Sequence, residues 1–188
     1  DISYEIMISQ MKEHGLKPLT VEELKDYFCF PIKKYYKDVG FPTDSQSFHD
    51  LAHSYLEAYK KKVKEKAQVF SGTKEMLSEL KGKNQFMISA SEESYLKELV
   101  SSYSLAPHFK KIYGLADSYG VSKFERCSRL LKENNLEASE TLLIGDTSHD
   151  AEVAQKSGIQ VLLLADGFQK YGKLKDLEVE VFESRYHA

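Results

Sequence analysis

The sequence of 188 residues has little cysteine, no excess of positive charge and no long apolar run. Its two cysteines, Cys29 and Cys127, are far apart and form no C-x-x-C pair, which argues against a disulfide framework and favours reduced thiols. A formal net charge of -3 gives no support for nucleic-acid binding. No stretch is apolar over the length of a membrane helix, and no signal peptide or lipidation motif is found. We therefore expect a cytoplasmic protein with neither nucleic acid nor membrane as partner.

What is present is typical of a soluble globular protein, because hydrophobic residues make up 41% of the chain and charged residues 29%. The first part of the chain predicts helices only. Residues 2–15 carry apolar side chains at helical spacing, and Thr20 with Glu23 forms the capping box of a second helix. A third helix is expected over residues 47–66, with lysines on its polar face. These helices predict a small helical domain over residues 1–67.

After Val69 the pattern changes to short apolar strands that alternate with helices, which predicts an α/β domain over residues 68–188. Continuously apolar strands separated by helices indicate a doubly wound parallel sheet that is covered on both faces. Ligands of such sheets bind beyond the carboxyl ends of the strands. The expected strands are QFMIS, KIYGL, TLLI, QVLLLA and VEVFES.

Two polar residues of this domain have both a structural and a functional interpretation. Ser89 ends the first strand and forms an S-x-x-E capping box with Glu92, so it is either a helix N-cap or a ligand-binding hydroxyl. Lys123 follows Ser122 in the first turn of a helix, where the helix dipole disfavours a cation. A phosphate on that helix N-terminus would reverse the effect, because it would attract both the free N–H groups and the ammonium.

Two carboxylates, Asp146 and Asp150, follow the strand TLLI in a polar turn. They are either a turn aspartate and a helix cap or the ligands of a hard cation. In the second case Asp146 would bind Mg²⁺ directly and Asp150 would orient a bound water or the turn, because Mg²⁺ takes few carboxylates and keeps waters. Together with Ser89 and Lys123 they predict a site for phosphate and magnesium.

These residues resemble the motifs of the haloacid dehalogenase-like (HAD) hydrolases, in the branch with a helical cap domain inserted after the first core strand. QFMISAS is similar to the family's second motif, with Ser89 and Ala90 at the phosphate, and Lys123 is similar to the lysine of the third. IGDTSHD resembles the GDxxxD form of the fourth motif. The resemblance covers essentially the whole chain and is nearest to phosphoglycolate-phosphatase-like enzymes. It implies Mg²⁺ as cofactor and a small phosphorylated metabolite as substrate, and we expect a monomer or homodimer.

The family's first motif, DxDGT, is missing from this sequence, and with it the nucleophilic aspartate and the acid/base aspartate. Asp1 is the only aspartate near the start, and it leads straight into the first helix. The resemblance implies a covalent aspartyl phosphate whose nucleophile this chain does not supply. We expect an additional N-terminal segment of about a dozen residues or more that forms the central strand. The strands that end at Ser89 and Ile144 should then not pair with each other.

Other interpretations remain open at this point. A binding or regulatory protein that kept the fold and lost its catalytic aspartates would also lack the first motif. His49 and His53 lie one helical turn apart and resemble half of a zinc hydrolase site, although no third ligand is evident. His149 and the loop over residues 166–172 could border the site, and the sequence does not decide this.

Overall fold

A computed structural model describes residues 2–115 and 122–184, so Asp1 lies outside the described residues. The chain divides into two compact units, which are treated separately below. The first unit comprises Asp1–Gln68, Asp146–His149 and Leu163–Ala188, and the second comprises Val69–Gly145 and Asp150–Leu162. This grouping is not the linear division at residue 67, which stays a prediction. Within the described ranges, no helix has the length and apolar character needed to cross a bilayer.

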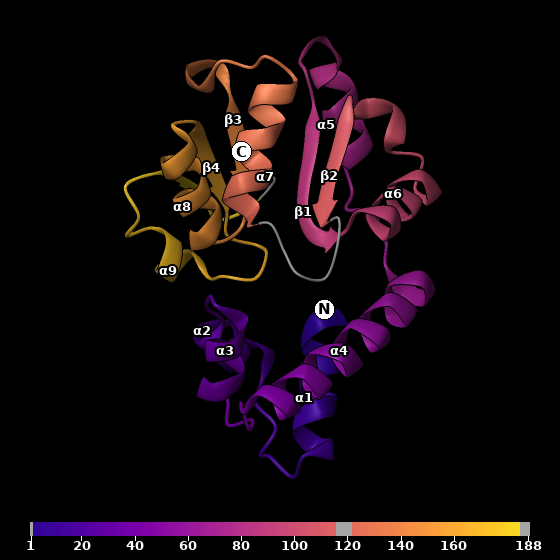
Figure 1. Ribbon diagram of the computed structural model, residues 1–188, viewed down its shortest axis with the longest axis vertical. Helices are drawn as coiled ribbons and strands as arrows, with labels where there is room; N and C mark the ends of the chain where they lie inside the picture. Colours follow the sequence, from indigo (N-terminus) through magenta and orange to yellow (C-terminus); the bar gives the residue numbers. More distant parts are fainter. Residues whose placement is uncertain (1, 116–121, 185–188) are drawn as a thin grey trace. The chain divides into compact units, whose positions relative to one another are not determined.

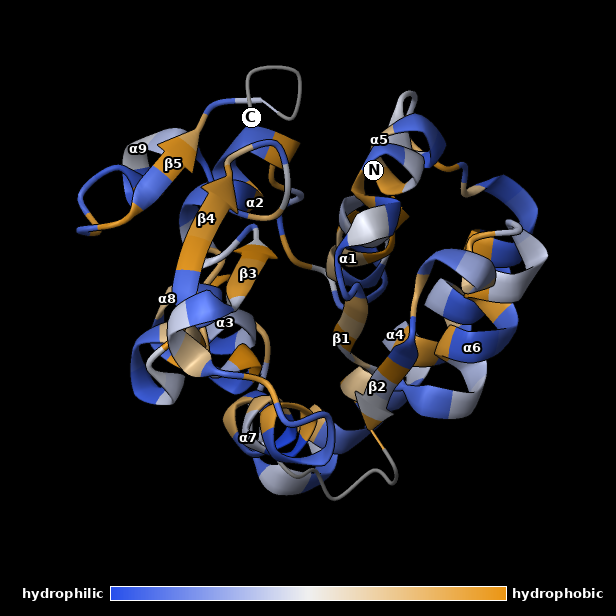
Figure 2. Cartoon of the chain, turned by 90° about the horizontal axis from the view of Figure 1, so that it is seen from above, coloured by the Kyte–Doolittle hydropathy of each residue, from blue (hydrophilic) through white to orange (hydrophobic). Residues whose placement is uncertain are grey.

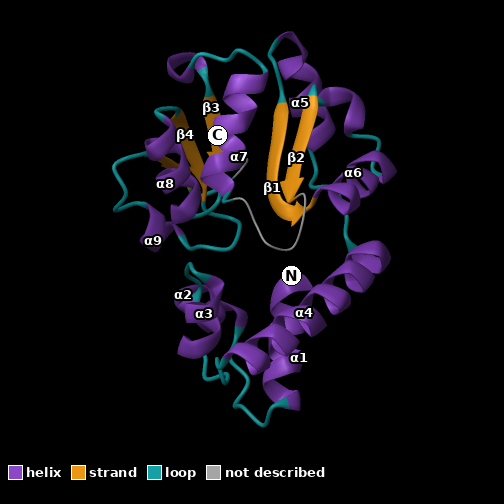
Figure 3. Cartoon of the chain, viewed as in Figure 1, coloured by secondary structure: helices purple, strands orange, loops and turns teal. Residues whose placement is uncertain are grey.

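The first unit is built mainly from helices (Figure 3). They are α1 (Ile2–Glu13), α2 (Val21–Tyr27), α3 (Ile32–Asp38) and α4 (Ser45–Lys66), with the short α9 (Tyr171–Leu174) and strand β5 (Glu180–Phe182) from the end of the chain. Tyr4, Met7, Met11 and Leu24 form the centre of its apolar core, and Phe168 packs against them from far along the sequence. Burial of this aromatic-rich cluster is the main force that holds the unit together.

Local sequence patterns predict some of these helices correctly and miss others. The capping box of Thr20 and Glu23 is confirmed at the start of α2. Helix α4 begins two residues before the predicted Ser47, because Asp44 serves as its N-cap and accepts a hydrogen bond from the Ser47 N–H. Helix α3 was not predicted. Its buried residues are the adjacent Tyr35 and Tyr36, and two neighbouring apolar positions do not show helical spacing.

The second unit alternates strands and helices, as the sequence predicts. From Thr73 onwards the elements are α5 (Thr73–Glu79), β1 (Phe86–Glu92), α6 (Glu93–Ser102), β2 (Lys111–Leu115), α7 (Lys123–Glu133), β3 (Leu142–Gly145), α8 (Ser148–Ser157) and β4 (Gln160–Leu164), with 3₁₀ turns at Leu80–Gly82, Ala106–His108 and Ala138–Glu140. The first two residues of α8 and the last two of β4 are grouped with the first unit. Strands β1 and β2 pair in parallel, with Phe86 opposite Lys111 and Ile88 opposite Tyr113. The α/β class with parallel strands is thereby confirmed, and the apolar character of β4 is visible in Figure 2.

The strands form two sheets where one was predicted. The described strands pair as β1-β2 and as β3-β4-β5, so β1 and β3 are not hydrogen-bonded to each other. Even so, Ile88 of β1 and Leu143 of β3 pack on the same apolar cluster, which also contains Cys127 of α7. Figure 1 shows α7 beside β1 and β3. One helix thus packs against both sheets, which share no strand among the residues that the structure describes.

Strand β3 has exposed apolar side chains beside its unpaired edge. Leu142 is 50% exposed and Ile144 is 51% exposed, whereas Leu143 between them is buried. Alternate residues of a strand point to opposite faces, so one whole face of β3 is open to solvent.

Candidate active site

Lys123 and Asp150, both singled out from the sequence, form an ion pair in the second unit. The lysine ammonium donates a hydrogen bond to Asp150 Oδ1. The lysine side chain is 19% exposed and that of the aspartate only 3%. Water therefore screens this pair weakly, and either charge would be costly to keep in this environment without the other.

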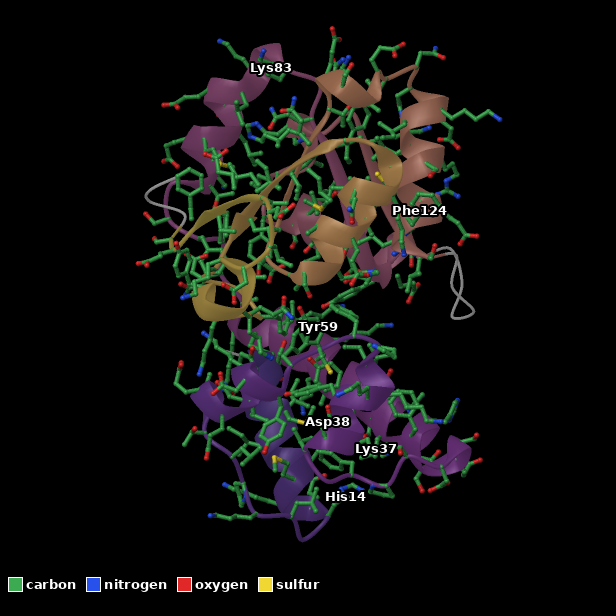
Figure 4. The ribbon with its side chains drawn as sticks, turned by 90° about the vertical axis from the view of Figure 1, so that its left-hand side faces the viewer. His14, Lys37, Asp38, Tyr59, Lys83 and Phe124 are labelled. Atoms are coloured by element: carbon green, nitrogen blue, oxygen red, sulfur yellow. The ribbon has the colours of Figure 1, made fainter. Side chains whose placement is uncertain are left out.

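The helices that carry the pair fix its position. Lys123 is the first residue of α7, whose N-cap Ser122 forms the predicted capping box with Glu125. Figure 4 marks the next residue, Phe124, in the same first turn. Asp150 is the third residue of α8, so the interpretation as an N-cap is wrong, because that helix already begins at Ser148.

Residue 145, directly before Asp146, has to be a glycine because of its close approach to Asp150. A Cβ atom on this residue would lie 2.5 Å from both Cβ and Cγ of Asp150, which is closer than real Cβ contacts. Only glycine lets the end of β3 approach the Asp150 side chain this closely.

Asp146 belongs to the first unit and is held by the loop after β4. Its Oδ2 accepts a hydrogen bond of 2.9 Å from the backbone N–H of Phe168. A Cβ on Gly167 would lie 2.0 Å from the same oxygen. The 166–172 loop therefore contacts a candidate metal ligand. Because Asp146 and Asp150 fall in different units, only the chain between them fixes their separation, and four residues span at most roughly 14 Å.

Ser89 lies within β1, and the predicted capping box with Glu92 is wrong. The strand continues to Glu92, which pairs with Leu115 after a bulge, and α6 begins only at Glu93 without a side-chain cap. The residues after Ser89 therefore pair with β2 and do not form the helix start that the capping pattern favours. The Ser89 hydroxyl accepts a hydrogen bond of 3.1 Å from the Ser91 N–H, and the next residue, Ala90, is exposed. Both residues lie at the bulge, close to the carboxyl end of the strand.

The turn of Asp146 is supported by Phe168 and Gln169, which lie in the 166–172 loop named from the sequence, and by Tyr4, which sequence reasoning missed. The buried Gln169 accepts a hydrogen bond of 2.6 Å from the Ser148 N–H through its Oε1. The Tyr4 hydroxyl donates to the carbonyl of Phe168 at 3.1 Å. Burial, and next the negative charge of Asp146, raise the pKa of Tyr4, so its hydroxyl stays a donor. No local pattern connects Tyr4 to this loop, because 164 positions separate it from Phe168.

His149, which the sequence leaves undecided as a neighbour of the site, is half-buried and has a specific neighbour. Its ring lies 4.8 Å from that of Phe30, measured between centroids, with the planes tilted by 34°. Both residues belong to the first unit, to which Asp146 also belongs. Phe30 of the helical segment thus contacts His149, which is three positions after the candidate metal ligand Asp146.

The metal-binding capacity of the described residues is limited to pairs of ligands, since no three of their His, Cys, Asp and Glu side chains gather around one point. This fits Mg²⁺, which commonly uses one or two carboxylates and completes its shell with waters and phosphate oxygens. Asp146 and Asp150 supply oxygen donors of this type. His49 and His53 are exposed on α4 with ring centroids 6.5 Å apart, and within the described ranges they lack the third ligand that zinc requires.

Comparison with protein families matches residues 1–164 to the model of the haloacid dehalogenase-like hydrolases. Among curated proteins no match was found.

Several solved structures share the fold at low sequence identity. A haloacid dehalogenase-like family hydrolase from Streptococcus pneumoniae has a TM-score of 0.80 at 20% identity, over 96% of this chain and 85% of its own. A haloacid dehalogenase-like protein of unknown function from Agrobacterium tumefaciens has a TM-score of 0.79 at 18% identity, over 98% and 86%. A candidate phosphoglycolate phosphatase from Lactobacillus delbrueckii has a TM-score of 0.72 at 16% identity, over 98% and 89%.

Proposed function

Because the chain belongs to the haloacid dehalogenase-like hydrolase family, we propose that it is a Mg²⁺-dependent phosphatase acting on a small phosphomonoester. The observation that carries this proposal is the buried pair of Lys123 and Asp150. A lysine held at the N-terminus of α7 is suited to neutralise a phosphoryl group, because the ammonium and the N–H groups of the first turn both attract the anion.

Each residue at the strand ends has a role in this proposal. The Ser89 hydroxyl and the backbone N–H of Ala90 bind phosphate oxygens, and Lys123 stabilises the charge that develops on the transferring group. Asp150 holds the lysine in place. Asp146 binds Mg²⁺, which when bound polarises the phosphate oxygens and shields their charge.

The proposed reaction needs a nucleophile that the described residues do not supply. In the reaction that we propose, a carboxylate nucleophile forms a bond to phosphorus while the ester P–O bond breaks, and the leaving oxygen takes a proton from a neighbouring acid. Water then attacks phosphorus, which releases inorganic phosphate and restores the carboxylate. Among the described residues, β1 and β3 do not pair directly with each other.

The test is thermal unfolding with and without inorganic phosphate and Mg²⁺. The two ligands together should raise the melting temperature, because they bind only the folded state. Lys123→Ala should lose most of this rise, each variant being compared with its own ligand-free value. Lys156→Ala removes an exposed lysine of α8 and should keep the full rise. A full rise in Lys123→Ala would rule out the assignment of the phosphate site.

A further inference from the structure

The loop after β4 lies against one side of the Asp146 carboxylate. The backbone N–H of Phe168 donates to Asp146 Oδ2 at 2.9 Å. A Cβ atom added to Gly167 would collide with the same oxygen and would lie 2.6 Å from both Cβ and Cγ of the aspartate. The loop backbone is therefore in direct contact with this side of the carboxylate. A space that cannot hold a methyl group cannot hold a hydrated cation.

Tyr4 of α1 fixes the loop residue that makes this contact. Its hydroxyl donates to the Phe168 carbonyl at 3.1 Å, and the centroids of the two rings lie 6.0 Å apart. Tyr4 is only 2% exposed, so water cannot readily take its place as the donor. Tyr4, Phe168 and Asp146 all belong to the first unit. The carbonyl of Phe168 is thus held by Tyr4, while its N–H holds Asp146.

The number of oxygens that one carboxylate can offer discriminates between divalent cations. Mg²⁺ requires nearly octahedral geometry at about 2.1 Å, whereas Ca²⁺ takes roughly six to eight oxygens and often binds both oxygens of one carboxylate. Asp146 is poorly suited to bind a cation with both oxygens, because Oδ2 accepts the Phe168 N–H and packs against Gly167. The support of this side chain therefore favours the smaller cation.

We propose that Tyr4 is a positioning residue for the metal site. Through Phe168 it restricts Asp146 to binding a cation with one oxygen, and this restriction makes the site prefer Mg²⁺ over Ca²⁺. The inference rests on the proposed function, in which Asp146 binds Mg²⁺, and it adds a residue of α1 that acts on the metal only through the loop.

The experiment measures the dissociation constants of Mg²⁺ and Ca²⁺ by isothermal titration. The variant Tyr4→Phe keeps the ring and removes the hydroxyl. It should weaken Mg²⁺ binding by about tenfold, which is the lower end of the range for lost partners of metal ligands. Ca²⁺ binding should weaken less, because a carboxylate released from the loop can offer both oxygens. The ratio of the two constants should therefore shift towards Ca²⁺.

Tyr36→Phe is the matched control. Tyr36 is a buried tyrosine of the same core, and its hydroxyl donates to Gln10 Oε1 at 3.2 Å. Each variant loses one buried hydrogen bond, so both should be destabilised to a similar degree in urea. Tyr36→Phe should nevertheless keep the wild-type ratio of the two dissociation constants. A Tyr4 that only stabilised the fold would lower stability without changing this ratio.

The outcomes separate this inference from the function on which it rests. If Asp146→Asn abolishes Mg²⁺ binding but Tyr4→Phe keeps the wild-type ratio, the role of Tyr4 is wrong and the metal assignment stands. An equal shift of the ratio in Tyr4→Phe and Tyr36→Phe would also overturn that role, because the effect would not pass through the loop. If the folded wild type binds Mg²⁺ no more tightly than Asp146→Asn does, the metal assignment and this inference fall together.

Discussion

The ammonium of Lys123 and the carboxylate of Asp150 form an ion pair from which most water is excluded. Replacing Asp150 by asparagine keeps its shape and leaves the lysine without its counter-charge. We expect Asp150→Asn to lower the free energy of unfolding by about 3 kcal/mol, the scale for breaking a buried pair. Urea denaturation at neutral pH measures this change. The double variant Lys123→Met with Asp150→Asn should recover part of the loss, and a fully additive double variant would show that the two charges do not interact.

A substitution at Gly167 should displace the carboxylate of Asp146 while leaving its charge unchanged. A methyl group at Gly167 would collide with Asp146 Oδ2, so Gly167→Ala should weaken Mg²⁺ binding by roughly tenfold or more, as disturbed supports of metal ligands do. Gly172→Ala, in the same loop region, meets no atom within 4 Å and serves as the control. Isothermal titration with Mg²⁺ should distinguish the two. Equal affinities would mean that Asp146 does not bind the metal.

At the scale of single residues, the sequence predicts well which side chains belong to the candidate site. It predicts poorly which other groups hold these side chains in place. Lys123 and Asp150 were singled out because a strand end followed by a capped helix is a local pattern, and the structure joins them. The partner of Asp146 is a backbone N–H, which every residue except proline carries, so no letter of the sequence marks Phe168 for this role.

At the scale of elements, α7 is tied to β2 by a carboxylate. Glu133 at the end of α7 accepts hydrogen bonds from Lys111 Nζ at 2.7 Å and from the Tyr113 hydroxyl at 2.9 Å. The hydrogen bond from Lys111, followed by that from Tyr113, lowers the pKa of Glu133. The folded state therefore holds this carboxylate ionised at lower pH than the unfolded state does.

This difference gives stability a pH dependence with a definite sign. The contribution of Glu133 is complete above the ordinary glutamate pKa of about 4.3 and is lost as the pH falls through the lower folded value. Glu133→Gln should therefore lose less stability than the wild type between roughly pH 5 and pH 3. Glu178→Gln, at an exposed position, should follow the wild type. Urea titrations across this range test the prediction, and parallel curves for Glu133→Gln and wild type would contradict it.

Elements were predicted best where their signals are local. Helix α7 and strand β2 have the predicted bounds, since a capping box and an apolar run between polar residues define them. The predicted helix start at the Ser89 capping box was wrong, because the residues around Ser89 pair with β2, which lies about twenty residues further along. Hydrogen bonding between strands decides such cases, and a single sequence does not show which strands will pair.

At the scale of the whole molecule, the two sheets predict how the protein would respond to an added strand. A segment of about a dozen residues placed ahead of Asp1, with apolar residues that suit a buried strand, should pair with both β1 and β3. It should raise the melting temperature and slow hydrogen exchange of the β3 amides, because free edges become bonded. The same segment with prolines at alternate positions is the control. Unchanged exchange in β3 would show that no strand belongs between the two sheets.

The first unit is assembled from segments that lie far apart along the sequence, and this has a consequence during biosynthesis. Tyr4 bonds to Phe168 across 164 positions, and Phe28 stacks on the same ring. A nascent chain that has emerged only through α4 lacks that ring, so its aromatic residues remain incompletely covered while the whole second unit is being translated. The ribosome must deliver Phe168 before helices α1 and α2 can complete their core, so these helices become fully native only after the second unit has been translated.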